Sequence, residues 1–329
     1  MKAQLQFGKM FVTAIATTQR GKQNSITVAG STNGAAQGRP FEIVGSSYDD
    51  NRHFFLGQFF RNNFENWLSS LPQVTSGVNV TRVEVYLMNR QNDTQTLRNV
   101  AAFTDMGEGK PYNDKVWTGN GAHLPANNKS NNLLETLVQK KISRDADQID
   151  LELTNLGLTV SNDYEKITSA RKLAPTEYTF HKELGYITLS RKLQNDEAVA
   201  VAFEYTYNGT VYKVGEMSED YSNLKEEQVV FLKMLRPKKV LPKIDGLVAP
   251  MWNLMMKNIY NLNVQGLTRD GFQLRVIYRD DKTGKDNPQL QEGTISRTKQ
   301  LIEVMGLDRL NPYNDPQPDG TSTSLTSSQ

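Results

Sequence analysis

The sequence predicts a strand-rich α+β protein with mixed or antiparallel sheets and a few packed amphipathic helices. Three observations predict this class. Many short segments alternate apolar and polar residues, one segment carries an aromatic stripe at helical spacing, and Asn208-Gly209 separates two alternating segments. No repeat of fixed period is present, so a solenoid is not expected.

Residues 1–40 are expected to hold one strand followed by a polar loop. Residues 5–19 carry apolar side chains on both parities and end at Arg20-Gly21. This pattern is typical of a buried strand, and it also fits one strand of a membrane barrel. Residues 30–40 are small and polar, which indicates a loop and a boundary.

Residues 41–160 are predicted to form an α+β subdomain that begins with a short strand. An aromatic helix is expected over 52–71, because Asp49-Asp50-Asn51 offers N-caps and Pro72 stops the helix. Its apolar side chains recur at spacings of three and four, which indicates core packing: Phe55, Leu56, Phe59, Phe60, Phe64, Trp67 and Leu68. A half-buried strand follows at 78–89.

A long loop rich in Gly, Asn and Asp is predicted over residues 104–132, and its length suggests a contact surface. Trp117 and Tyr112 in this loop, with Tyr221 further along, are the predicted exposed platforms of a binding surface. His123 also lies there, and a lone histidine among amides indicates polar surface and no catalysis. Short helices are expected at 133–141 and 149–156.

Residues 161–310 are predicted to form a β-rich subdomain, and residues 311–329 a flexible tail. The hairpin at Asn208-Gly209 joins strands 198–207 and 210–214. A helix over 250–260 is expected to begin at Pro250. Further strands and a last helix complete the subdomain, with strands at 164–173, 177–180, 186–190, 229–235 and 272–278 and the helix at 296–305.

The residues needed for common enzyme chemistry are missing from the sequence. Cysteine is absent, and none of the three histidines lies within four residues of another. No nucleophile elbow and no P-loop is present, so we expect no catalytic residue, no cofactor and no enzyme. Asp315 and Asp319 leave a weak alternative, a calcium site in the tail, against an ordinary Pro/Asp turn.

The charge balance argues against nucleic acid or a nucleotide as a partner. Lys and Arg number 38 against 36 Asp and Glu, and no basic face is evident. The most apolar window, residues 247–256, is broken by Pro250 and Asn253, so no segment reaches the roughly 18 residues of a membrane helix. The sequence alone therefore predicts a soluble chain.

Several segments in a fixed order resemble one family. They are Asn51-Arg52-His53-Phe54-Phe55-Leu56, Thr81-Arg82-Val83-Glu84-Val85-Tyr86, Asp163-Tyr164-Glu165-Lys166, Glu177-Tyr178-Thr179-Phe180, Tyr205-Thr206-Tyr207-Asn208-Gly209, Trp252-Asn253-Leu254-Met255-Met256 and Asn314-Asp315-Pro316-Gln317-Pro318-Asp319-Gly320. Together they are similar to the SprA/Sov family, the outer-membrane translocon of the type 9 secretion and gliding machinery of the Bacteroidetes. The similarity runs from about Gln19 to Gly320.

The resemblance implies a non-catalytic soluble segment of a giant barrel translocon. It implies contact with secreted cargo, with other outer-membrane secretion subunits and with the rest of the same translocon chain. Its location would be the bacterial outer membrane, facing the periplasm, the barrel lumen or the exterior. A start at Met1 without a signal sequence and a tail of low complexity suggest a truncated reading frame or an engineered fragment. The alternative is a stand-alone glycan- or peptide-binding module of the cell envelope.

Overall fold

The protein, described here from a computed structural model, divides into two compact units. Tyr48–Asn261 form the central unit, and Met1–Ser47 together with Leu262–Gln329 form the split unit. This differs from the predicted division at residues 160 and 161, because strands from both sides of that point share one sheet. The structure describes residues 2–7, 10–15, 24–30, 39–70, 73–88, 97–244, 246–262, 273–290, 292–294 and 297–307.

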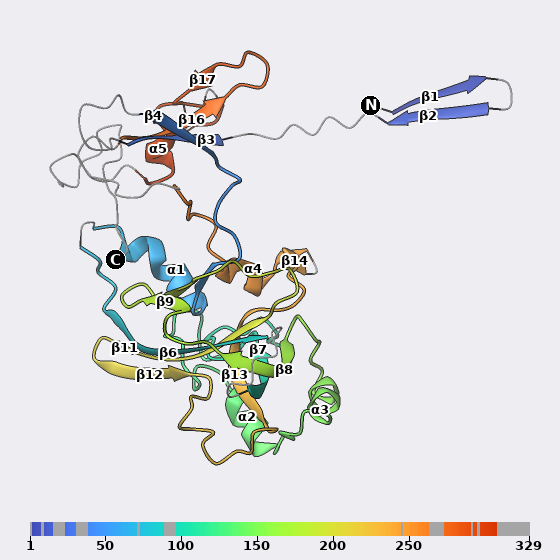
Figure 1. The fold of residues 1–329 in the computed structure, drawn as a ribbon, viewed down its shortest axis with the longest axis vertical. Helices are drawn as coiled ribbons and strands as arrows, with labels where there is room; N and C mark the ends of the chain where they lie inside the picture. The colour runs from blue at the N-terminus through green and yellow to red at the C-terminus, as the bar shows by residue number, and fades with distance from the viewer. Residues whose placement is uncertain are drawn as a thin grey trace. The chain divides into compact units, whose positions relative to one another are not determined.

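Strands of the central unit close into a small barrel (Figure 1). Its members are β6 (Val78–Met88), β7 (Leu97–Phe103), β8 (Tyr164–Lys172), β11 (Val199–Tyr207) and β13 (Val229–Arg236). Hydrogen bonds link them in the order β11-β13-β7-β8-β6 and back to β11. The β7–β13 pair is parallel and the others are antiparallel. The predicted strand-rich α+β class is therefore confirmed.

Strand β11 organises the barrel because three strands pair with it. Strand β6 follows one edge over the whole length, from Val199 to Tyr207. The other edge is shared, with β13 at Val199–Val201 and β12 (Thr210–Val214) at Phe203–Tyr207. The predicted hairpin is confirmed: Asn208 and Gly209 have φ of 49° and 82°, the left-handed pair of a tight hairpin turn.

The aromatic helix is shorter than predicted and begins later. Helix α1 spans Gln58–Trp67, whereas His53–Phe55 form strand β5. Strand β5 pairs with β10 (Tyr186–Leu189), which also pairs with β9 (Tyr178–His181). Asn51 has a left-handed φ of 57° and does not cap the helix. Backbone pairing with β10 overrides the helical pattern at these residues.

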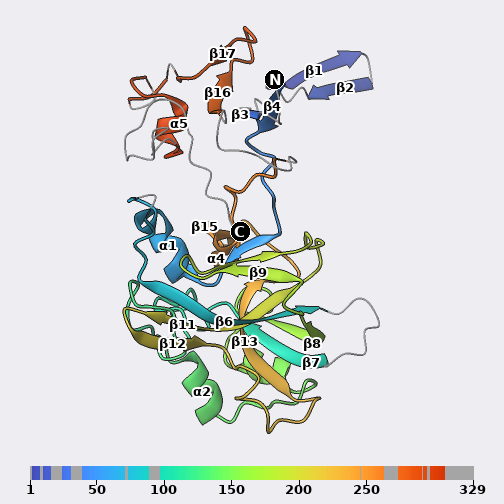
Figure 2. The same cartoon turned by 60° about the vertical axis from the view of Figure 1, so that its left-hand side comes forward.

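Core packing of α1 is confirmed. Phe59, Phe60 and Trp67 are buried, and the Phe60 ring meets the rings of Phe203 and Tyr205 on β11 edge-on, with centroids 5.8 and 5.0 Å away. Helix α1 lies on one side of the barrel strands and α2 (Leu133–Gln139) on the opposite side in both views (Figures 1 and 2). The barrel is therefore sandwiched between two helices.

The remaining helices of the central unit are short. Helices α2 and α3 (Ile149–Asn155) match the predicted ranges. Helix α4 ends at Leu254 (Pro250–Leu254), so the prediction of a helix to residue 260 is wrong. The chain turns extended at Met255, which bridges to Phe54 of β5. None of the helices in the described part of the chain has the length and apolar character needed to cross a membrane.

In the split unit, the prediction of one strand over 5–19 is wrong. Strands β1 (Lys2–Phe7) and β2 (Met10–Ile15) form an antiparallel pair, with Phe7 opposite Met10. A separate sheet has the order β17-β16-β3-β4. Its strands are β3 (Asn24–Gly30), β4 (Arg39–Val44), β16 (Gln273–Arg279) and β17 (Asp286–Asn287), and helix α5 (Leu301–Val304) is shorter than predicted.

Candidate functional site

The loop between β7 and α2, residues 104–132, folds over a buried polar network. Lys233 lies within β13, whose residues are all buried, and only 1% of it is exposed. Its Nζ donates to Glu108 Oε1 at 2.7 Å and also to the carbonyl oxygen of Thr104. A buried ammonium needs such partners because removal from water costs several kcal/mol. The pair therefore ties the start of the loop to the barrel.

Glu108 also caps helix α1. Its two carboxylate oxygens accept the backbone N–H of Gln58, the first residue of the helix, at 3.1 and 3.3 Å. A carboxylate at a helix N-terminus satisfies free N–H groups and meets the positive end of the helix dipole. One side chain of the loop thus joins the loop, the helix and the barrel.

Asp105 shapes the first turn of the loop. It is buried and accepts the backbone N–H groups of Tyr112 and Asn113 at 2.6 and 3.0 Å. Burial raises its pKa to about 6, against the opposing effect of the two N–H donors and of nearby Lys233. The loop is therefore folded around a carboxyl group that titrates near neutral pH.

Asn131 closes the loop at its other end. Its buried side-chain amide donates to the carbonyl oxygens of Asp105 and Glu108 at 2.6 and 2.8 Å. The backbone is also packed tightly: Gly121 N–H donates to Gly109 O at 3.0 Å, and a Cβ at Gly119 would lie 2.4 Å from the same oxygen. No side chain fits at Gly119, so a glycine is required there.

The longest exposed stretch of this loop is residues 118–124, which include His123 and Leu124. We call this stretch the loop tip. Its side chains are small, polar or singly apolar. Its backbone is held by hydrogen bonds from the N–H groups of Thr118, Asn120 and Gly121 to Asn132 Oδ1, Ser130 O and Gly109 O. A long surface loop held this rigidly presents a preformed surface for contact with another protein.

The predicted aromatic platforms are not exposed as a group. Trp117 is 2% exposed and Tyr221 is 6% exposed, so both predictions of exposure are wrong. Tyr112 is half-buried in the loop. The Tyr221 hydroxyl bonds to that of Tyr86, and the Arg98 guanidinium lies 5.2 Å from the centre of the Tyr221 ring. Both large aromatic side chains belong to the core.

A second polar cluster surrounds Tyr221. Buried Glu84 accepts Ser218 Oγ–H at 2.7 Å and the Tyr86 hydroxyl at 3.0 Å, and it pairs with Lys172 at 2.9 Å. Lys172 Nζ also donates to Ser218 Oγ at 2.7 Å. An ammonium that donates hydrogen bonds has no lone pair with which to activate a serine. This cluster therefore positions the segment after β12 without forming a nucleophile and base.

Acidic residues and histidines are the remaining candidates for a metal site in the described residues. No group of three His, Asp or Glu in that part of the chain is arranged to hold a metal ion. His53 is bonded between Thr188 Oγ1 and Asp49 Oδ2, at 2.8 and 3.1 Å, and burial lowers its pKa. Asp315 and Asp319, the residues of the calcium alternative, lie outside the described residues.

Sequence reasoning missed Lys233, Glu108 and Asn131. The one available signal for Lys233 was a lysine inside an apolar strand, residues 229–235. A charge in such a segment indicates a buried partner, although the pattern does not name that partner. Its partner Glu108 lies far away in the loop sequence, and only the barrel pairing of β7 with β13 brings them together.

Comparison with known proteins gives one family. The family model SprA_N, described as a motility-related or secretion protein, matches residues 1–215. This region includes α1, the loop and all barrel strands except β13. A comparison with curated proteins gives no match. Because the matched region covers more than half of the 329 residues, the chain belongs to the SprA_N family of motility-related and secretion proteins.

Proposed function

We propose that this chain is a non-catalytic segment of the outer-membrane protein-secretion machinery that also serves gliding motility, and that it docks secreted cargo and partner subunits. Membership of a motility and secretion family supports the first part. The observation that carries the second part is the loop tip, residues 118–124, which is exposed and whose backbone is held by hydrogen bonds to Gly109, Ser130 and Asn132. Preorganised backbone lowers the entropy cost of binding.

The polar groups of the site support docking better than catalysis. Asp105, Glu108 and Lys233 are buried, and their hydrogen bonds hold backbone groups and each other. A catalytic carboxylate or amine must reach a substrate. These groups instead stabilise a surface, which is the role expected of a scaffold.

The stand-alone binding module for glycans or peptides is a weaker proposal. It relied on exposed aromatic platforms, and Trp117 and Tyr221 are buried. Aromatic side chains stack on a ligand only where their faces are accessible.

Site-specific photo-cross-linking tests the proposal. A photoreactive amino acid is placed at His123 in the protein expressed from its own gene, and a matched control carries it at Gln139, an exposed residue on α2. We expect cross-links to a secreted cargo protein or to a subunit of the secretion apparatus from residue 123, and far fewer from residue 139. Equal cross-linking from both positions, or none from residue 123, would contradict docking at the loop tip.

A further inference from the structure

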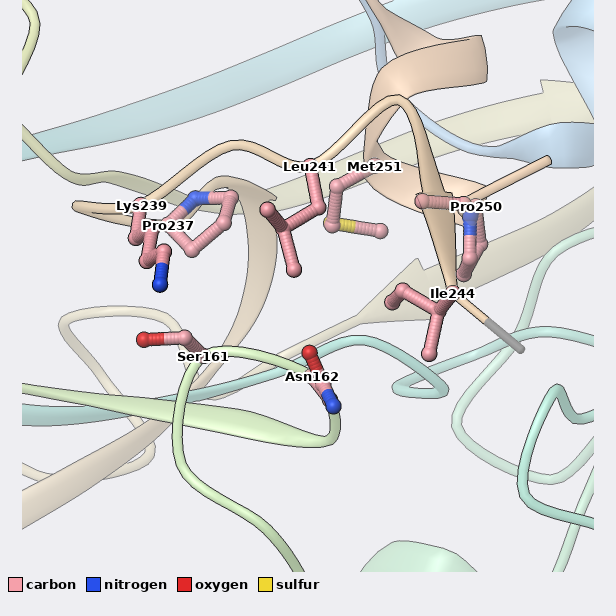
Figure 3. A pocket seen from close by; sticks show the side chains of 9 residues that line it. Ser161, Asn162, Pro237, Lys239, Leu241, Ile244, Pro250 and Met251 are labelled. Atoms are coloured by element: carbon pink, nitrogen blue, oxygen red, sulfur yellow. The ribbon is translucent and has the colours of Figure 1, made fainter. Parts of the chain in front are cut away.

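A small pocket of the central unit lies between residues 161–162 and the segment 237–251 (Figure 3). It is a shallow hollow with an enclosed volume of about 10 Å³, the size of a water molecule. The segment 237–251 contains the antiparallel hairpin of β14 (Lys243–Ile244) and β15 (Leu247–Val248). The lining residues are Ser161, Asn162, Pro237, Lys239, Leu241, Ile244, Ala249, Pro250 and Met251.

One side of the pocket is polar and has unused hydrogen-bonding capacity. The Asn162 side-chain amide makes no hydrogen bond to any described residue. Ser161 Oγ donates to Glu165 Oε2 at 3.0 Å, which leaves its lone pairs free to accept. Figure 3 shows these two side chains across from Leu241 and Ile244, with Lys239 at one side. Such a lining suits a ligand with both polar and apolar groups.

The charge around the pocket is positive. Buried Glu165 is paired with Lys238, 3.4 Å away, and buried Asp163 accepts hydrogen bonds from Asn113 and from the backbone of Thr159. Lys239 and Lys243 are exposed and form no ion pair with any described residue. Lys238 thus offsets the charge of Glu165, whereas Lys239 and Lys243 have no carboxylate partner among the described residues.

Apolar side chains project into solvent beside these lysines. Leu247 is 67% exposed, Val248 48% and Leu241 37%, and Val160, next to Ser161, is 50% exposed. Large apolar residues that gather on one exposed hairpin mark a contact site more often than singly scattered ones do. We call Val160, Lys239, Leu241, Lys243, Leu247 and Val248 the hairpin surface.

We propose that the hairpin surface binds an extended peptide segment of a partner protein in which apolar side chains alternate with Asp or Glu. Charge complementarity selects the acidic residues, since Lys239 and Lys243 lack partners among the described residues. Leu241 and Leu247 supply apolar contacts, and the Asn162 amide is available to a peptide backbone group. Strand β15 pairs with β14 alone among the described strands, so its other edge can accept an added strand.

This inference rests on the proposed function, because it names the chemistry of one segment that the scaffold docks. It places that segment on a hairpin surface distinct from the loop tip, residues 118–124. The two surfaces share no residue, so each can be changed without altering the other.

Fluorescence anisotropy of a labelled peptide tests the inference with the full chain. The probe is a short synthetic peptide in which Leu and Val alternate with Asp and Glu, and its counterpart carries Lys in place of each acidic residue. We expect saturable binding of the acidic peptide, weakened by salt. We expect the double variant K239E/K243E to bind the acidic peptide about tenfold more weakly and the basic one more tightly.

The apolar part is tested separately by L247S/V248S, for which a similar loss is expected. Matched controls are V138S/L151S, which alters exposed apolar residues on α2 and α3, and K140E/K225E, which reverses two exposed lysines elsewhere. Native tryptophan fluorescence checks that each variant is folded. Equal binding of both peptides, or equal losses in the control variants, overturns the proposal.

Vesicles that contain anionic lipid provide the competing outcome. If the chain binds these vesicles through Leu247 and Val248 but binds no acidic peptide, the surface recognises lipid and the inference is wrong. If peptide binding fails while cross-linking at His123 persists, the inference fails and the proposed function stands. If peptide binding succeeds while that cross-linking is lost, docking at the loop tip fails alone.

Discussion

Replacing Lys233 with Met should strongly destabilise the central unit. The ammonium of Lys233 is the partner of the Glu108 carboxylate at 2.7 Å and a donor to the Thr104 carbonyl. Methionine has a similar length and fills the same space without a charge or a donor. The variant therefore leaves a buried carboxylate without its counter-ion, and it leaves a carbonyl oxygen without its donor.

The expected loss is about 4 kcal/mol in the free energy of unfolding. Breaking a buried ion pair by removing one partner costs about 3–5 kcal/mol, because the remaining charge stays desolvated. The double variant K233M/E108Q should lose only about 1–2 kcal/mol, since the glutamine is neutral and its oxygen still accepts the Gln58 N–H. The second substitution should thus restore stability that the first removes.

Urea unfolding followed by tryptophan fluorescence measures these values. The chain has three tryptophans, Trp67, Trp117 and Trp252, and all lie in the central unit, so the signal reports this unit alone. If K233M lies too close to unfolding for a full curve, E108Q alone and the double variant give the same comparison. A loss below about 1 kcal/mol for K233M, or strict additivity of the two substitutions, would refute the buried-pair argument.

Three further predictions follow from the loop and the hairpin. Burial raises the pKa of Asp105 to about 6 from the usual 3.8, so the folded state binds the proton of this carboxyl group more tightly than the unfolded state does. The free energy of unfolding should therefore fall by about 3 kcal/mol as the pH rises from 4 to above 6. In D105N that part of the fall should disappear from urea unfolding curves, and an unchanged pH slope would contradict the assignment. Gly119→Ala should lower the unfolding free energy in urea by more than about 2 kcal/mol, because its Cβ meets Gly109 O at 2.4 Å, and a loss below about 1 kcal/mol would contradict the clash. Gly209→Ala should lower the unfolding free energy by about 1–2 kcal/mol through backbone strain alone, since φ is 82° and nothing lies within 4 Å of the new Cβ. A folded variant whose melting temperature is unchanged in thermal unfolding would contradict this.

Short sequence patterns correctly predicted the elements whose hydrogen bonds join residues close together in the sequence. The hairpin at Asn208-Gly209 is correct in both strands, and the range of helix α2 is correct within two residues. The aromatic stripe located the packed face of α1 but placed its start too early. The start depends on Glu108, which caps Gln58 from 50 residues away. No pattern around residues 49–58 contains that information.

The site could be predicted only in outline. The length and composition of the loop at 104–132 indicated a contact surface, and the structure shows an exposed loop tip. The exposure of single aromatic residues could not be predicted, because Trp117 and Tyr221 are buried by segments distant in sequence. The Tyr221 hydroxyl, for example, meets that of Tyr86, 135 residues earlier. Burial of this kind depends on closure of the barrel and produces no periodic pattern in the sequence.

The barrel has a consequence for how the chain is made. Strand β13 completes the ring by pairing with β7, and Lys233 reaches Thr104 across 129 residues of sequence. During synthesis the strands before it emerge without their closing partner, and contacts this distant in sequence form slowly. The family match ends at residue 215, ahead of Val229–Arg236. A fragment of this chain cut at that point would carry Glu108 without its counter-ion and an open sheet edge, so we expect a stable recombinant piece of this chain to extend beyond Arg236.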